Sequence, residues 1–260
     1  MQPKSAQKYY LIFLFMLNNH FFDLLDSVDS TNNYAMAQIN TGFAKDGTAY
    51  FTKLQTKGKG QQGKFWQSAV EKNILLSVVF EMDSLKLANA FEFNMLVAIT
   101  TRAFFQKYVE EKVTIKWPND IFWCDRKAGG ILIENIFSGT TWKWAVVGIG
   151  ININQTDFEA ELKNPISLQL ITQKVYPVID LAKQLHQQLL ANITAYKKGE
   201  LANIVQQYNN FLFKKEKKVK LKKGTIAFET TIKHVDEKGM LHCEDVMERE
   251  FGFGEVEWVL

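Results

Sequence analysis

The 260-residue chain has 47% hydrophobic and 23% charged residues, the composition of an ordinary globular protein that can bury a sizeable core. Its net charge of +3 is too small to indicate a nucleic-acid partner by itself. The two cysteines, Cys124 and Cys243, lie far apart without histidines at metal spacing, which argues against a disulfide framework and a zinc site and favours a reducing compartment.

The chain begins with a basic and apolar segment that has two interpretations. Lys4 and Lys8 precede an apolar run over residues 9–17, which has the order of a short secretory signal but cannot span a membrane. No cleavage site with small residues follows the run. We favour the second interpretation, in which translation starts at Met16, residues 1–15 are an extension, and the protein is neither cleaved nor exported.

The rest of the chain alternates between strand and helix patterns. Capping at Ser30 or Thr31 starts a helix that runs through Gln38 and closes near Gly42. The further elements expected, in chain order, are strands over 47–55 and 74–80, a helix over 87–108 capped by Ser84, a strand over 113–117, a turn over 117–120, a short strand over 121–123, a turn over 125–130, paired strands over 131–137 and 142–153, helices over 178–198 and 200–213, and short strands from 214 to 260.

A glycine loop between two expected strands satisfies parts of two phosphate-binding patterns. Gly58, Gly60 and Gly63 have the spacing of the dinucleotide fingerprint, and Gly58, Gly63 and Lys64 have that of a Walker loop. Phe65 stands where a Walker loop needs Ser or Thr, and no helix follows the glycines as the dinucleotide fold requires. The loop is therefore either a flexible anion-binding loop or a solvated turn with stray lysines.

Five motifs occur in order from Asp29 onwards. They are DSTNN at 29–33, GKGQQGKFW at 58–66, KWPND at 116–120, KAGGILIE at 127–134 and VGIGIN at 147–152. Together they resemble the biotin protein ligases, and the resemblance extends to the C-terminus. It implies an α/β (α+β) fold, in which a class II synthetase-like catalytic domain with a mixed sheet over residues 16–213 precedes a small SH3-like β-barrel over residues 214–260.

The lysine-rich segment at 214–223 is compatible with that barrel. Its sequence KKEKKVKLKK carries seven lysines, which by number alone would suggest a nucleic-acid site. Val219 and Leu221 alternate with lysines, as they do on a strand with one exposed face. We therefore favour a half-exposed strand.

The resemblance also implies a two-step reaction. Biotin and MgATP form biotinyl-5′-adenylate, and a lysine of a biotin carboxyl carrier domain then attacks it to give an amide, which is the activity of a biotin–acetyl-CoA-carboxylase ligase. We expect no nucleic-acid or membrane partner and either a monomer or a homodimer. We expect a cytoplasmic location, because ATP and unmodified carboxylases are found there.

Joining a carboxylate to ATP brings two anions together, so the site requires converging cations. We place Lys127 on a tight turn that ends in Gly129 and Gly130. The resemblance assigns Lys127 to biotin's carboxylate and the phosphate, with Lys59 and Asp120 as further catalytic residues. It also places Mg²⁺ near Asp120 and Asn152, whose oxygens suit a hard cation.

The binding residues implied by the resemblance divide by ligand. Those for the ureido ring of biotin are neutral hydrogen-bonding residues: Ser30, Thr31, Asn32 and Gln55. Trp66 is the aromatic against which the adenine packs in this family. The others are Gly58, Lys59, Gly60, Gln61, Lys64, Asn119, Lys127, Gly129, Gly130 and Asn152.

Two departures from the family pattern leave alternatives open. Only 28 residues precede Asp29, too few for a helix-turn-helix domain, so a repressor role is not expected. Gln61 stands where the better-known loop has an arginine, and it lacks the fork-shaped guanidinium, which leaves open how tightly the loop retains the adenylate. The alternatives are a lipoate-type ligase of the same fold, a biotin-sensing DNA-binding regulator and a catalytically inactive binding module.

Overall fold

A computed structural model describes residues 21–86, 89–160 and 162–259. The basic and apolar segment and the start expected at Met16 lie outside the described residues. Within the described ranges, no helix is both long and apolar enough to cross a membrane.

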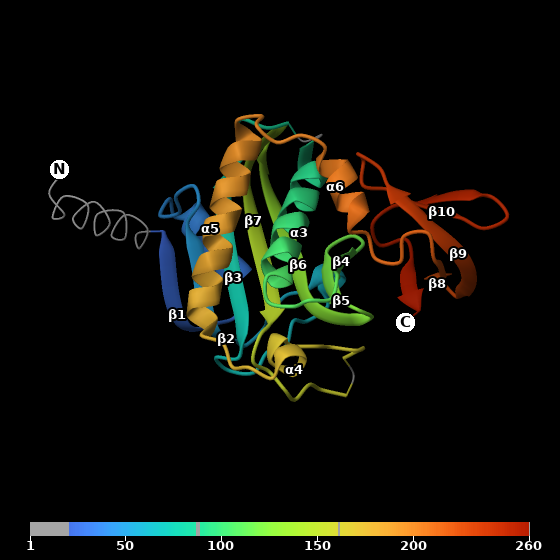
Figure 1. Ribbon diagram of the computed structural model, residues 1–260. Helices are drawn as coiled ribbons and strands as arrows, with labels where there is room; N and C mark the ends of the chain where they lie inside the picture. The colour runs from blue at the N-terminus through green and yellow to red at the C-terminus, as the bar shows by residue number, and fades with distance from the viewer. Residues whose placement is uncertain (1–20, 87–88, 161, 260) are drawn as a thin grey trace, which may run out of the picture.

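A seven-stranded mixed sheet forms the centre of the larger part of the molecule (Figure 1). Its strand order is β1-β2-β3-β7-β6-β5-β4, in which β1 and β2 are parallel and all other neighbours are antiparallel. The mixed sheet expected from the sequence is confirmed. The strands are β1 (Phe22–Val28), β2 (Ala49–Gln55), β3 (Asn73–Glu81), β4 (Val113–Lys116), β5 (Asp120–Trp123), β6 (Arg126–Ser138) and β7 (Thr141–Asn152).

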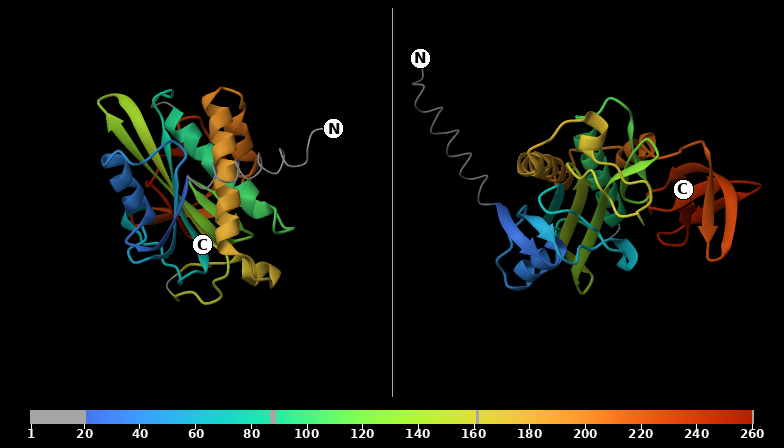
Figure 2. Two further views of the ribbon diagram at one scale, coloured as in Figure 1. Left: turned by 90° about the vertical axis from the view of Figure 1, so that its left-hand side faces the viewer. Right: turned by 90° about the horizontal axis from the view of Figure 1, so that it is seen from below.

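The two faces of this sheet have different coverings. Helices α3 (Ala90–Gln106) and α5 (Val178–Lys197) pack on one face, whereas α2 (Thr31–Asn40) lies on the other, as the left view of Figure 2 shows. Ile149 and Ile151 of β7 belong to the core beneath α3 and α5. Because successive side chains of a strand point to opposite faces, the even-numbered residues of β7 lie on the α2 face.

A second sheet follows α6 (Ile204–Asn210) and lies beside the β4–β5 edge (Figure 1). It has five antiparallel strands in the order β11-β10-β9-β8-β12, where a barrel was expected. In β8, Leu221 is buried while Lys220 and Lys222 are exposed, so the alternation expected in the lysine-rich segment is confirmed. The strands are β8 (Lys218–Lys223), β9 (Ile226–Val235), β10 (Leu241–Glu244), β11 (Glu248–Phe251) and β12 (Glu257–Val259).

Hydrogen bonds join the second sheet to the first part of the chain. The indole Nε1 of Trp117 donates to the Gly239 carbonyl at 3.0 Å, and the Asn209 side chain exchanges two hydrogen bonds with the backbone of Val235. Gly239 has a φ of +85°, a backbone conformation that favours glycine, in the turn between β9 and β10. The KWPND segment is thereby anchored to the second sheet.

Several expected elements are wrong in extent. Helix α3 follows Asn89, so the cap predicted at Ser84 is wrong. Asn203 has a left-handed backbone, which restricts the helix predicted over 200–213 to α6. Strand β4 ends before Trp117, and a short helix, α4 (Leu168–Thr172), was not predicted.

Candidate active site

Two glycines of β7 create the space on which the candidate site is built. A Cβ on Gly148 would lie 2.3 Å from Oδ1 of Asn32, and a Cβ on Gly150 would lie 2.4 Å from the ring of Trp66. Both distances are shorter than van der Waals contact. Asn32 and Trp66 therefore rest directly on the backbone of β7, on the α2 face of the sheet.

A group of neutral polar side chains surrounds Asn32 at the start of α2. The Ser77 hydroxyl donates to Oδ1 of Asn32 at 2.6 Å and lies 2.7 Å from Oγ1 of Thr31. Oε1 of Gln55 accepts the Thr31 amide at 2.8 Å and the Thr31 hydroxyl at 3.1 Å. The structure thus brings together three of the four residues that the sequence assigned to a ureido ring, and it adds Ser77.

Ser30 and Ser77 show what the sequence reading missed here. Ser30 is buried and occupies the N-cap position of α2, but its side chain makes no capping hydrogen bond, contrary to the cap expected. The Asp29 carboxylate instead accepts the Ser30 amide at 2.6 Å and the Asn33 side chain at 2.5 Å. Ser77 is fully buried in an otherwise apolar stretch of β3. A single polar residue in such a stretch is the sequence feature that could have marked it as a site residue.

Lys127 lies in strand β6, so the turn predicted over 125–130 is wrong. The chain reverses at Cys124 and Asp125, where Cys124 has a φ of +50°. A bulge then pairs Ile121 with Gly129 but Phe122 with Lys127, leaving Ala128 as the extra residue. Ala128 enters the core under the helices.

The bulge turns Lys127 towards the face that carries Trp66. Its Nζ lies 2.8 Å from Oδ1 of Asp120 and 5.7 Å from the centre of the Trp66 ring. A Cβ on Gly130 would be 3.4 Å from Cε of Lys127 and 3.5 Å from Asp120 Oδ1. Lys127, Asp120 and Trp66 therefore surround Gly130, and the carboxylate of Asp120 lies next to the ammonium of Lys127.

Lys116 is a further cation of this region. It begins the KWPND motif, but no role was predicted for it from the sequence. Its backbone lies opposite that of Asp120 in the antiparallel register of β4 and β5. Its ammonium lies 5.1 Å from the Phe122 ring and 5.6 Å from the Trp258 ring. Burial lowers the pKa of Lys116 to about 8, Asp120 raises it, and Lys127 lowers it further.

This burial predicts that Lys116→Met will be more stable than the wild type at pH 7. In the unfolded chain the lysine has a pKa near 10.5, so the cost of burying its charge is full below pH 8 and disappears as the pH rises towards 10.5. We expect the free energy of unfolding in urea to rise by about 1 to 3 kcal/mol at pH 7, and by less at pH 10.

Lys143→Met is the matched control for this stability change, because Lys143 forms an exposed pair with Asp83. It should show no gain at pH 7. An equal change in the free energy of unfolding of both variants would contradict a destabilising burial of the Lys116 charge. A gain for Lys116→Met that does not shrink as the pH rises would contradict it too.

The glycine loop folds back on itself and lies across β6. A Cβ on Gly58 would be 2.2 Å from the carbonyl oxygen of Trp66, so only glycine lets the two backbone segments come this close. In this arrangement the Trp66 amide donates to the Gly58 carbonyl at 2.9 Å. The Gly60 amide donates to the Lys64 carbonyl at 2.6 Å. The side chains of Gln61 and Asn119 both donate to the carbonyl of Ile131 in β6.

A cavity of about 520 Å³ opens beside this loop. Gly58, Phe65 and Trp66 line it from the loop, and Gln155 and Phe158 line it from the segment after β7. The cavity is largely polar and lies next to Trp66, the residue against which the adenine is expected to pack.

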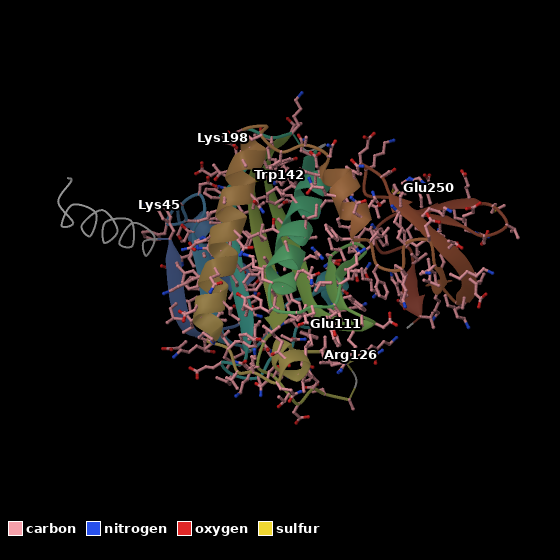
Figure 3. All side chains as sticks on the ribbon, viewed as in Figure 1. Lys45, Glu111, Arg126, Trp142, Lys198 and Glu250 are labelled. Atoms are coloured by element: carbon pink, nitrogen blue, oxygen red, sulfur yellow. The ribbon has the colours of Figure 1, made fainter. Side chains whose placement is uncertain are left out.

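Lys59 occupies a different position from Lys127. Its Nζ pairs with Oε1 of Glu134 at 2.9 Å, and Glu134 is four residues beyond Gly130 along β6. In Figure 3, Arg126 at the start of β6 is labelled low in the view and Trp142 near the start of β7 is labelled high in it, which marks the two ends of this long hairpin. The structure does not bring Lys59 to the Lys127–Asp120 pair, and its catalytic role stays a prediction.

Asp120 and Asn152 have the atoms needed for the Mg²⁺ expected from the sequence. Nδ2 of Asn152 donates to the carbonyl of Ile166 at 3.2 Å and lies 3.5 Å from that of Lys127, which leaves its Oδ1 as the atom for a cation. Among the described residues, no three His, Cys, Asp or Glu side chains converge as a metal site. Mg²⁺ is commonly held by one or two protein oxygens together with substrate phosphates and waters, so the side-chain oxygens of Asp120 and Asn152 are of the kind that it takes.

Comparison with known proteins gives consistent results. Residues 24–152 match the model of the biotin/lipoate A/B protein ligase family. The chain is 30% identical over 229 residues to the bifunctional ligase/repressor BirA of Escherichia coli, covering 85% of this chain and 68% of that protein. It is 27% identical over 143 residues to the biotin–acetyl-CoA-carboxylase ligase of Mycobacterium tuberculosis, covering 54% of this chain and 52% of that one.

Solved structures show the same fold. A biotin protein ligase from Aquifex aeolicus in complex with biotin and ATP has a TM-score of 0.74 at 23% identity, covering 91% of this chain and 97% of that one. A biotin protein ligase from Leishmania major in complex with biotinyl-5-AMP has a TM-score of 0.61 at 21% identity, covering 89% and 98%.

Proposed function

Because the chain belongs to the biotin protein ligases of the biotin/lipoate A/B protein ligase family, we propose that it joins biotin to a carrier protein in two steps. In the first, the biotin carboxylate attacks the α-phosphate of ATP, giving biotinyl-5′-adenylate and pyrophosphate. In the second, the amine of a carrier lysine attacks the acyl carbon, giving an amide and AMP. This is the reaction of a biotin–acetyl-CoA-carboxylase ligase.

The first step needs positive charge at the point where two anions meet. Lys127 is held by Asp120 at 2.8 Å and lies beside Trp66, and its ammonium would contact both the carboxylate and the α-phosphate. Asp120 and Asn152 would hold Mg²⁺, which when bound supplies charge neutralisation at the phosphate oxygens. Trp66 would pack against the adenine.

The second step needs the adenylate to be retained until the carrier lysine arrives. The glycine loop covers β6 through the Gln61 side chain, which donates to Ile131 at 3.4 Å. A loop closed over the intermediate would exclude water from the mixed anhydride. We propose a biotin carboxyl carrier domain as the acceptor and the cytoplasm as the compartment, since ATP and unmodified carboxylases occur there.

One observation carries this proposal. The neutral hydrogen-bonding group at Asn32 and the charged group at Lys127 lie on one face of one sheet, and Trp66 sits between them over the alternating glycines of β7. A neutral ring, a carboxylate and a nucleotide can therefore bind side by side.

The test is direct. The purified chain is incubated with biotin, MgATP and a biotin carboxyl carrier domain, and biotin on the carrier is detected by blotting; lipoate replaces biotin in a parallel reaction. We expect biotin-dependent pyrophosphate release and a labelled carrier. Adenylate formation with lipoate alone would favour the lipoate-type ligase, and no reaction with either acid would contradict the proposal.

The same function predicts that the glycine loop is ordered by its ligands. Residues 56–67 contain three glycines and have Lys57, Lys59 and Lys64 as trypsin sites. We expect trypsin to cut the loop more slowly when biotin and ATP are present, because the closed loop is less exposed. Cleavage at Lys198, in the turn after α5, should not change. Equal rates at the loop with and without ligands would disprove an ordering lid.

A further inference from the structure

Glu134 joins two parts of the site that lie far apart in the sequence. Its Oε2 accepts the Asn32 side-chain amide at 2.7 Å, while its Oε1 lies 2.9 Å from Nζ of Lys59 in the glycine loop. One carboxylate therefore contacts both the polar group around Asn32 and the loop that covers β6.

The contacts of Asn32 determine which way its amide points. Nδ2 donates to Glu134 and to the Leu132 carbonyl at 3.3 Å, and both partners can only accept. Oδ1 accepts the Ser77 hydroxyl at 2.6 Å. Reversing the amide would place its oxygen against a carboxylate and a carbonyl. Glu134 thus holds the Asn32 oxygen on the Ser77 side, above Gly148.

This orientation matters for a ureido ring, on the proposed function above. The ring has N–H groups that need acceptors, and Oδ1 of Asn32 is a buried acceptor that lies directly over Gly148. We propose that Glu134 is a positioning residue: it orients Asn32 for the ring and, through Lys59, couples the order of the glycine loop to the binding of the ring at Asn32.

Glu134→Ala and Glu134→Gln separate the two contacts. Alanine removes both acceptors and leaves the buried Asn32 amide without its carboxylate partner, so the biotin Kd and the biotin KM should rise at least about tenfold with the ATP KM retained. Glutamine keeps an oxygen that can accept from Asn32 but loses the charge that holds Lys59. It should bind biotin within about threefold of the wild type and lose loop protection.

Loop protection is measured by trypsin cleavage within residues 56–67 with and without biotin, and biotin binding by titration calorimetry. Glu134→Gln should show faster cleavage and a smaller protection by biotin, whereas Lys143→Met, which removes an exposed ion pair elsewhere in the sheet, should show neither. Thermal unfolding checks that each variant is folded. If Glu134→Ala does not fold, Glu134→Asp, which withdraws the carboxylate from both partners, replaces it.

The possible outcomes separate this inference from the proposed function. A wild-type chain that neither binds biotin nor forms adenylate contradicts the function itself. If the wild type does both, but the alanine or aspartate variant binds biotin as tightly, the orienting role is overturned. Unchanged loop protection in Glu134→Gln overturns the coupling through Lys59.

Discussion

Lys127→Ala is expected to slow adenylate formation by about a hundred- to a thousandfold, the usual loss when one preorganised donor is removed from a developing charge. The structure fixes this ammonium at 2.8 Å from Asp120 and beside Trp66, on a bulge that presents it to the α2 face. Without it, two anions would meet with Mg²⁺ as the principal neutralising charge. Pyrophosphate release in a single turnover, without carrier protein, measures the step directly.

The control for this loss is Lys143→Ala, which removes a lysine from an exposed pair in β7 and should form adenylate at the wild-type rate. Supplying preformed biotinyl-adenylate provides a second comparison. Lys127→Ala should transfer biotin from it with a much smaller loss than in the first step. The biotin carboxylate, whose charge Lys127 neutralises, is already part of the adenylate at that point. A wild-type rate of pyrophosphate release would show that another group is the catalytic cation.

The sequence analysis predicted Lys127 as a site residue and placed it in a turn, whereas the structure places it in strand β6. A glycine pair after a lysine is typical of a turn, and nothing in that segment indicates a bulge. The bulge depends on how β6 pairs with β5, and such pairing is set by contacts between strands rather than by local composition. Motif resemblance can therefore name a residue whose orientation only the pairing determines.

The residues missed by the sequence analysis share a long sequence separation from their partners. Ser77 lies 45 residues from Asn32, and Glu134 lies 75 from Lys59. No periodicity within one element reports such contacts. Strand β1 was missed for a local reason: its half-buried residues recur every third position, so it lacks the two-residue alternation of a half-buried strand.

The helices were easier to predict than their ends. The regular apolar spacing of α3 and α5 indicated both, because each buries a continuous stripe against the sheet. Their boundaries depend on single backbone conformations. Asn203, with a φ of +60°, interrupts the helix expected over 200–213, and an asparagine there is compatible with either outcome.

Gly148→Ala and Gly150→Ala should damage different halves of the site, although they lie two residues apart on the same strand. Neither glycine has a positive φ, so alanine is compatible with the backbone at both positions, and the effect comes from the added methyl group. At Gly148 that group would lie 2.3 Å from Oδ1 of Asn32, and at Gly150 it would lie 2.4 Å from the Trp66 ring.

Asn32 cannot retreat without breaking hydrogen bonds to Ser77 and Glu134, so Gly148→Ala should raise the biotin KM by about ten- to a hundredfold and leave the ATP KM near its original value. The backbone amide of Trp66 donates to the Gly58 carbonyl, which limits how far Trp66 can move away from an added methyl group. Gly150→Ala should therefore raise the ATP KM about tenfold or more and affect biotin binding little. Each variant is the control for the other, and initial rates of pyrophosphate release over a matrix of biotin and ATP concentrations give both constants. If both substitutions raise the same KM to the same extent, the glycines do not separate an acid pocket from a nucleotide pocket, and Asn32 and Trp66 must serve one ligand together.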